Sequence, residues 1–327
     1  MNFDYNEEQQ LLADSVRRFL QKDYDFEARK RILASAAGWS ERVWATFAEM
    51  GLTGLPLSPD YGGFGGGAVD LMSVMEAFGE ALVVEPYVPT ILAALAVARA
   101  GSPEQKKSIL PLVAQGKMRL ALATGPRGVI GAPMAGRIVY AEKGRLLLIE
   151  PKVVSSYRTL DDLAAGDLAF DGAGEEMKGA GVLDEVLDFG TALSCAEAVG
   201  AMKFACDTTL EYLKTRRQFG VPIGAFQALQ HRMVDMFIAY EQAKSMACLA
   251  CSKIDSFENA KDRARAVSAA KIKIADSARH ISQEAVQLHG GMGMSEELKV
   301  SHSFRRLTVL ARRFGDADHH LARFASL

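Results

Sequence analysis

Two stretches of the chain carry side chains suited to holding a nucleotide. In the first, residues 215–227 (TRRQFGVPIGAFQ), charged, amide and aromatic groups surround a glycine: Arg216, Gln218, Phe219 and Gln227. An arginine fork matches a phosphate, an amide matches a sugar edge, and an aromatic face stacks on a purine. Cations also commonly end helices because they interact with the helix dipole, so a plain helix–helix connection is the competing interpretation.

The second stretch, Gln287 to Glu296, reads QLHGGMGMSE and follows a long helical pattern. Gly290 and Gly291 can adopt left-handed dihedral angles and let a bound group approach the backbone. His289 lies in the same turn, where it is expected either to approach a bound base or to lie at the surface.

Together the two stretches resemble the C-terminal helical domain of the acyl-CoA dehydrogenases, in which TRRQFG…FQ is followed by Q-x-x-G-G-x-G. In that family both motifs hold the adenine-pyrophosphate half of FAD, and this FAD is bound mainly by the neighbouring subunit. The resemblance implies an acyl-CoA substrate and electron-transfer flavoprotein as acceptor. It also implies flavin contacts made in trans by seven residues: Arg216, Gln218, Phe219, Gln227, Gln287, Gly290 and Gly291.

The spacing of apolar residues predicts a helical beginning of the chain. Helices are expected at residues 6–20, 40–51, 70–81, 90–100 and 102–116, the last opened by a capping box. The run Gly63–Ala68 fits a G-x-G-x-x-A pattern, but a dinucleotide fingerprint requires a preceding strand and a βαβ unit, and neither is expected here. The pattern W…GL.GL..P..YGG.G instead resembles the N-terminal helical domain of the same family.

Beyond residue 120 the pattern changes to short β-rich runs. Ile138–Tyr140 and Leu146–Ile149 predict a hairpin, and two further short strands are expected at Val153–Val154 and Leu168–Phe170. Helical patterns at residues 191–214, 227–254, 259–289 and 296–313 then predict a four-helix bundle, whose long apolar faces indicate subunit packing.

The predicted fold is therefore mainly α with a small β middle domain, similar to the acyl-CoA dehydrogenases. Residues 1–118 are expected to form an N-terminal helical domain, residues 119–185 a reduced β domain, and residues 186–327 the C-terminal four-helix bundle.

The chain departs from the family at the catalytic base. Members desaturate an acyl-CoA thioester: a carboxylate removes the α-proton while FAD accepts the β-hydride. The position of the usual glutamate falls on Phe314, and the position used by a minority falls near Gly190. Neither side chain can take a proton. Asp316 and Asp188 lie nearby in sequence and are the only carboxylates considered as replacements.

The middle domain shows a matching departure. A family pattern similar to A.TEP..GSD, which supplies hydrogen bonds to the flavin ring, is replaced by ALATGPRGVIGAP at residues 121–133, where only Thr124 and Pro126 match. A family arginine after this domain falls on Thr191. The chain is thus predicted to have lost its own flavin-ring pocket and to have kept the residues that hold a neighbour's flavin.

This asymmetry predicts the base-lacking subunit of a heteromeric acyl-CoA dehydrogenase, of composition α2β2, that shares FAD with a homologous catalytic subunit. Family members built this way mostly act on bulky steroid side chains, and the loss of half the active sites would leave room for a large substrate. Two alternatives stay open. One is a homomeric scaffold or acyl-CoA-binding protein that has lost flavin. The other is a self-sufficient enzyme whose base is Asp316 or Asp188.

Composition restricts the remaining possibilities. The chain is 49% hydrophobic and 24% charged, as globular proteins are, and its net charge of −2 favours neither nucleic acid nor an anionic membrane as a partner. Its acidic N-terminus is not a signal peptide, and its longest apolar run is shorter than a bilayer requires, so a cytoplasmic location is expected.

Several other side chains are interpreted as structural. Cys248 and Cys251 are expected to be core residues in a reducing compartment, and no metal site is predicted. Two groups near the C-terminus are interpreted as solvated or subunit-facing: the pair His319–His320 and the basic residues Arg305, Arg306, Arg312 and Arg313.

Overall fold

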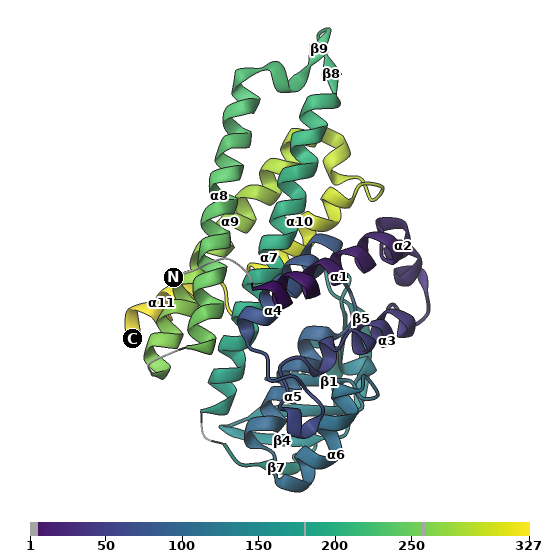
Figure 1. Ribbon diagram of the computed structural model, residues 1–327, viewed down its shortest axis with the longest axis vertical. Helices are drawn as coiled ribbons and strands as arrows, with labels where there is room; N and C mark the ends of the chain where they lie inside the picture. Colours follow the sequence, from purple (N-terminus) through teal and green to yellow (C-terminus); the bar gives the residue numbers. More distant parts are fainter. Residues whose placement is uncertain (1–5, 180, 257–258) are drawn as a thin grey trace. The chain divides into compact units, whose positions relative to one another are not determined.

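The computed structural model describes residues 6–179, 181–256 and 259–327. Internal contacts divide this part of the chain into two compact units. The bundle unit comprises residues 6–26, 72–83 and 191–327, and the sheet unit comprises residues 27–71 and 84–190. Figure 1 shows the elements of both units, coloured along the sequence.

The first third of the described chain is helical, as predicted. Its α-helices are α1 (Glu7–Asp23), α2 (Phe26–Ala34), α3 (Glu41–Glu49), α4 (Ala68–Ala81), α5 (Tyr87–Ala100) and α6 (Pro103–Ala114). Side-chain caps fix where α3 and α6 begin: Ser40 accepts from the Val43 amide, and Ser102 and Gln105 form the expected reciprocal capping box. Helix α2 was missed because the only residue it buries is Arg29, so it shows no apolar stripe.

The glycine-rich loop before α4 is closed on itself. The amides of Gly63, Gly65 and Gly66 donate to carbonyls of residues 54–58, the segment just before the loop. A Cβ atom at Gly63 would lie 2.1 Å from the Leu57 carbonyl oxygen, so only glycine fits there. A 3₁₀ turn, Pro59–Tyr61, precedes the loop instead of a strand, which agrees with the rejection of a dinucleotide fingerprint.

Two small sheets belong to the sheet unit. One has the order β1-β3-β4-β7, with β1 parallel to β3 and the other pairs antiparallel, and the other is antiparallel with the order β2-β6-β5. Their strands are β1 (Leu120–Ala123), β2 (Val129–Ile130), β3 (Arg137–Glu142), β4 (Arg145–Ile149), β5 (Val153–Arg158), β6 (Ala164–Leu168) and β7 (Glu175–Met177). The predicted β3–β4 hairpin is confirmed. Its turn residues, Lys143 (φ 49°) and Gly144 (φ 78°), are both left-handed, as a type I′ turn requires.

The C-terminal part is the expected bundle. Its helices are α7 (Val182–Thr215), α8 (Gln227–Asp255), α9 (Ala260–His289), α10 (Lys299–Leu310) and α11 (Ala317–Ser326). One core cluster joins the first four of these helices through Met202, Met236, Ile281 and Leu307, and α11 packs against α9. The bundle is confirmed, whereas the division into three domains at residues 1–118, 119–185 and 186–327 stays a prediction.

Helix α4 crosses α7 at backbone contact distance within the bundle unit. A Cβ atom at Gly79 would lie 1.8 Å from the Glu197 carbonyl oxygen, and one at Gly200 would lie 1.8 Å from the Glu76 carbonyl oxygen. The reciprocal pair of glycines therefore lets the two helices approach more closely than any larger residue would permit.

Candidate functional site

The first motif forms a small hairpin at the joint between α7 and α8. Strand β8 (Arg217–Gln218) pairs with β9 (Val221–Pro222), and the two turn residues between them are both left-handed. Phe219 has φ 53° and Gly220 has φ 80°. Left-handed backbone is unfavourable for a phenylalanine because its Cβ atom approaches the following carbonyl oxygen. The hairpin therefore holds an aromatic residue in a costly conformation.

The same phenylalanine is the most exposed large apolar side chain in the described chain. It is 91% exposed, and its ring forms a T-shaped contact with Phe226, with ring centroids 6.2 Å apart. A strained and solvated aromatic residue adds nothing to the stability of the isolated chain. Strained residues of this kind concentrate at functional sites, which makes Phe219 a candidate contact for a ligand or partner.

The polar residues of this motif are also exposed. The Arg217 side chain donates to the Gly220 carbonyl oxygen at 3.2 Å, which stiffens the hairpin. Within the described residues the Arg216 guanidinium makes no hydrogen bond or ion pair. Gln218 and Gln227 are exposed, and the Gln218 amide donates to the Arg217 carbonyl oxygen at 2.9 Å. The arginine is thus available to an anion.

The second motif ends α9 with an open glycine turn. Gly290 (φ 62°) follows His289, and a Cβ atom added at Gly290 or at Gly291 would meet nothing within 4 Å. Gln287 is exposed beside them. The glycines are therefore not needed for internal packing at this turn, and the backbone there is accessible to a bound group.

Tyr212 and His289 bring the two motifs together. Their rings are stacked with centroids 4.4 Å apart, and the Tyr212 hydroxyl lies 3.4 Å from the His289 carbonyl oxygen. The backbone carbonyl oxygen of Tyr212 also accepts a hydrogen bond from the Arg216 amide. The end of α7, which leads into the hairpin, therefore packs directly against the end of α9, which leads into the glycine turn.

His289 is a structural residue. It is only 4% exposed, its Nδ1 lies 2.8 Å from the Ala285 carbonyl oxygen, and burial lowers the pKa of its ring. A neutral imidazole donating to that carbonyl fits all three observations. The surface placement considered for His289 is wrong, and its stacking on Tyr212 fixes the joint between the motifs.

The predicted base position lies in the turn between α10 and α11. Phe314 occupies it with φ 61°, followed by Gly315 with φ 110°. Asp316 is exposed and caps α11, with its Oδ1 accepting the His319 amide at 2.9 Å. That hydrogen bond lowers the pKa of Asp316. A carboxylate with a lowered pKa and an occupied oxygen is a weak proton acceptor.

Asp188, the other carboxylate considered, is buried at 1% exposure in α7, within the sheet unit, and it is engaged in contacts there. Neither carboxylate is thus an exposed and uncommitted group.

The loop after β1, where the family's flavin-ring pattern would lie, is tied to β6. The Gly128 amide donates to Asp167 Oδ1 at 2.9 Å, and the Leu168 amide donates to the Pro126 carbonyl oxygen at 2.7 Å. The Tyr157 hydroxyl bonds the same Asp167 oxygen at 2.8 Å. These groups of the loop already have partners within the chain, so they do not offer free hydrogen bonds to a flavin ring.

Helix α8 carries an exposed apolar face. Val234, Phe237 and Ile238 are 53%, 56% and 48% exposed and recur at helical spacing. The hairpin and the glycine turn add further exposed apolar side chains in the same unit: Phe219, Val221, Phe226, Met292 and Met294. Such a concentration of apolar surface is typical of a subunit interface.

Two of the residues interpreted as solvated are in fact buried. Arg306 is 2% exposed and pairs with Glu197 at 2.5 Å, and its other nitrogen donates to the Val83 carbonyl oxygen at 3.0 Å. His320 is 1% exposed. These corrections follow from tertiary context, because a polar side chain is buried wherever the fold supplies its partners.

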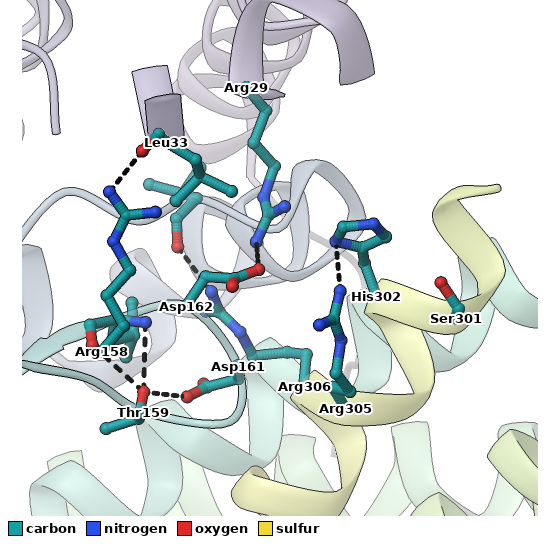
Figure 2. A network of polar contacts seen from close by, with 12 residues as sticks. Arg29, Leu33, Arg158, Thr159, Asp161, Asp162, Ser301, His302, Arg305 and Arg306 are labelled. Carbon is teal, nitrogen blue, oxygen red and sulfur yellow. Dashed lines mark hydrogen bonds and ion pairs between the residues drawn. The ribbon is translucent and has the colours of Figure 1, made fainter. Parts of the chain in front are cut away.

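Arg305 is partly exposed and bonds Glu296 at 3.0 Å and His302 Nδ1 at 2.8 Å. Figure 2 shows these α10 side chains, together with a polar cluster of the sheet unit.

That cluster joins α2 to the connection between β5 and β6. Arg29, which is 1% exposed, pairs with Asp162 at 3.0 Å, and Arg158 donates to the Leu33 carbonyl oxygen (Figure 2). Thr159 donates to Asp161 at 2.6 Å and folds the connection on itself. The ion pair explains why α2 buries an arginine in place of an apolar side chain.

The cysteines have no redox or metal-binding arrangement in the described chain. All four are free thiols, and burial raises the pKa of Cys195 to about 11 and of Cys206 to about 12. Residues 6–179, 181–256 and 259–327 contain no cluster of three or more His, Cys, Asp or Glu side chains able to hold a metal ion. No helix in these ranges is both long enough and apolar enough to cross a membrane.

Comparison with known proteins places these features in a family. Residues 6–117 match the model of the acyl-CoA dehydrogenase N-terminal domain, and residues 177–325 match that of the C-terminal domain. The chain is 30% identical to acyl-CoA dehydrogenase IpdE2 of Mycobacterium tuberculosis, over 92% of this chain and 91% of that protein. It is 28% identical to IpdE2 of Mycolicibacterium smegmatis, over 97% of this chain and 98% of that protein.

Solved structures share the fold. A steroid acyl-CoA dehydrogenase variant, Tcur3481-Tcur3483 G363A, superimposes with a TM-score of 0.91 at 25% identity, covering 98% of this chain and 97% of that one. A chain of the ChsE4-ChsE5 complex from Mycobacterium tuberculosis gives 0.92 at 22% identity, covering 100% and 98%. The two domain matches and the full-length similarity to IpdE2 establish that this chain belongs to the acyl-CoA dehydrogenase family.

Proposed function

We propose that the chain is a subunit of an FAD-dependent acyl-CoA dehydrogenase that completes the FAD site of a homologous partner and supplies no catalytic base itself. Family membership supports the reaction class, an oxidation of an acyl-CoA thioester, and supports FAD as the cofactor. The observation that carries the finer proposal is a contrast. The two motifs for a neighbour's flavin are exposed and adjacent, whereas the base position holds a phenylalanine.

The residues of the two motifs fit the adenine-pyrophosphate half of FAD. Arg216, with its guanidinium free among the described residues, would bind the pyrophosphate, and the open backbone at Gly290 and Gly291 would let the cofactor approach. Phe219 would stack on the adenine, because its side chain is exposed at the turn of the hairpin. Gln218, Gln227 and Gln287 would supply amide hydrogen bonds at the edge of the site.

Bound FAD supplies the acceptor for the hydride that leaves the β-carbon of the acyl chain. The α-proton must go to a carboxylate within hydrogen-bond reach, and this chain offers none at the expected position. Phe314 cannot accept a proton, Asp316 is committed to capping α11, and Asp188 is buried in α7. We therefore assign proton removal to the partner subunit.

The loop after β1 supports the same division of labour. The Gly128 amide and the Pro126 carbonyl are bonded to β6, and the acidic residue and GSD of the family pattern are absent. The chain's own flavin ring would lose those hydrogen bonds. The ring of the shared FAD would therefore lie against the partner's middle domain.

The exposed apolar face of α8 supports assembly with a partner. Val234, Phe237 and Ile238 are each about half exposed, so burying the remaining surface of one such side chain contributes roughly 1 kcal/mol. One similar structure is a steroid acyl-CoA dehydrogenase whose name, Tcur3481-Tcur3483, joins two designations. We infer an α2β2 assembly with a homologous catalytic subunit that acts on a bulky acyl-CoA and passes electrons to electron-transfer flavoprotein.

Purification of the chain alone and with the product of an adjacent homologous gene tests the proposal. The flavin spectrum and the subunit composition are recorded on the same sample. We expect the co-purified complex to be yellow and to oxidise acyl-CoA in a dye-linked assay, and the chain alone to be colourless and inactive. A colourless complex would instead support a scaffold that has lost flavin.

Exchange of the remaining carboxylates tests the missing base. Asp316→Asn and Asp188→Asn are each introduced into this chain within the complex. Turnover should stay at the wild-type value in both. A loss of turnover of a hundredfold or more, without loss of flavin, would make that residue the base and overturn the assignment.

A further inference from the structure

Buried polar side chains of α9 and α11 hold the turn between α10 and α11. It runs from Arg313 to Asp316, and its two central residues, Phe314 and Gly315, are both left-handed. Gly315 has φ 110°, a conformation that favours glycine, and a Cβ atom there would also lie 2.4 Å from His319 Cδ2. Phe314 does have a Cβ atom, and its conformation is therefore unfavourable by itself. Something else in the fold must hold it.

Lys271 of α9 holds the first half of the turn. It is 1% exposed, and its Nζ donates to the Leu310 carbonyl oxygen at 2.5 Å and to the Arg313 carbonyl oxygen at 2.8 Å. Leu310 is the last residue of α10, where backbone acceptors lack partners within the helix, and Arg313 begins the turn. The lysine thus fixes the residue immediately before Phe314.

His320 of α11 holds the second half. Its Nε2 lies 3.1 Å from the Phe314 carbonyl oxygen, and its Nδ1 lies 3.2 Å from Ser268 Oγ. Burial keeps this ring neutral at neutral pH by lowering its pKa to about 4, so it has a single N–H. Because a carbonyl oxygen only accepts, that N–H is on Nε2, and Nδ1 accepts from the serine hydroxyl.

The serine and the lysine come from one face of one helix. Ser268 and Lys271 are three residues apart on α9, a spacing that places both side chains on the same side. Lys271 and His320 therefore bind the carbonyls of residues 313 and 314, and Ser268 orients the His320 ring. Costly backbone conformations persist where the surrounding structure over-determines them, and they concentrate at functional positions.

We propose that Lys271, Ser268 and His320 form a positioning clamp that holds residue 314 in its left-handed conformation and so fixes the direction of its side chain. The clamp acts on backbone carbonyls and is independent of the side chain at that position. The clamp requires neither flavin nor a partner, so its test is independent of the proposed function.

Hydrogen exchange in a double-mutant cycle tests the clamp. The reporter is the Gly315 amide, which donates to the Arg312 carbonyl oxygen at 3.1 Å. Lys271→Met is compared with wild type in two backgrounds, Phe314 and Phe314→Gly. Exchange should accelerate about tenfold or more with Phe314 and about twofold or less with glycine, which adopts a left-handed conformation without help. Lys273→Met on the same helix serves as the control and should change neither.

Two results would overturn the proposal. If Lys271→Met leaves exchange at Gly315 unchanged with Phe314 present, the lysine does not hold the turn. If it accelerates exchange equally in both backgrounds, Lys271 supports the bundle in general and does not position residue 314. Ser268→Ala, a smaller change that removes only the hydroxyl, repeats the comparison should the lysine variant fail to fold.

Discussion

Replacement of Phe219 separates what this residue costs the free chain from what it contributes to binding. In the Phe219→Gly variant the left-handed strain disappears, because glycine adopts φ 53° freely. In Phe219→Ala the ring is lost but the strain stays. The ring is 91% exposed, so its removal sacrifices little packing in either variant. We therefore expect the glycine variant to be more stable than the alanine variant by about 1 kcal/mol.

The two variants should nevertheless lose FAD affinity equally. Stacking of an aromatic side chain on a base contributes roughly 1–3 kcal/mol, so removal of the ring should weaken FAD binding to the assembled complex by about 5- to 150-fold. Thermal unfolding of the free chain measures the stability of each variant. Titration of the apo-complex with FAD, followed by flavin fluorescence, measures its affinity.

The comparison has clear refuting outcomes. Wild-type FAD affinity in both variants would remove Phe219 from the flavin site. Equal melting temperatures for the glycine and alanine variants would show that the hairpin does not strain Phe219. If Phe219 is retained for binding, the Phe219→Gly variant should be more stable than Phe219→Ala and should bind FAD less tightly than the wild type.

Three further predictions concern buried ionisable side chains of the bundle unit. Burial lowers the pKa of Lys271 from 10.5 to about 8, so the unfolded chain binds more protons between these values and stability should rise with pH there, by about 3 kcal/mol. Denaturant unfolding of wild type minus Lys271→Met isolates this rise, and identical pH profiles would contradict it. Burial lowers the pKa of His320 from 6.5 to about 4, so the free energy of unfolding should fall by about 3 kcal/mol as the pH drops from the first value to the second. The His320→Gln variant should lose less stability over this pH range than the wild type does. An equal loss in both proteins would assign it to other groups. Arg306→Met should lower the free energy of unfolding by about 3–5 kcal/mol, because it removes the closer partner of buried Glu197. The double variant with Glu197→Leu should recover most of that stability. Additive losses would show that the two residues do not interact.

The pattern of apolar and capping residues predicted most of the fold. Local signals were enough to predict three features that the structure contains. These are the helices that begin after Ser40 and Ser102, the β3–β4 hairpin and the four-helix bundle. Helix α2 was missed because the residue it buries, Arg29, is held by an ion pair with Asp162, 133 residues away in sequence. No local pattern contains that information.

The candidate site shows the same limit. Spacing and residue type singled out both candidate motifs, but their contact through Tyr212 and His289 joins residues 77 positions apart, and no sequence signal marked it. Arg306 and His320 were interpreted as solvated because charged residues usually are. Their burial depends on Glu197 and Ser268, which lie on other helices.

Reconstitution of the complex from separately prepared subunits tests most directly whether this chain holds its partner's FAD. The partner stays wild type, and this chain carries either its own sequence or Arg216→Ala together with Gln287→Ala. We predict that the altered chain still assembles but that flavin bound per complex falls to a small fraction of the wild-type value. Unchanged flavin content, or one flavin bound by this chain in the absence of any partner, would contradict the account.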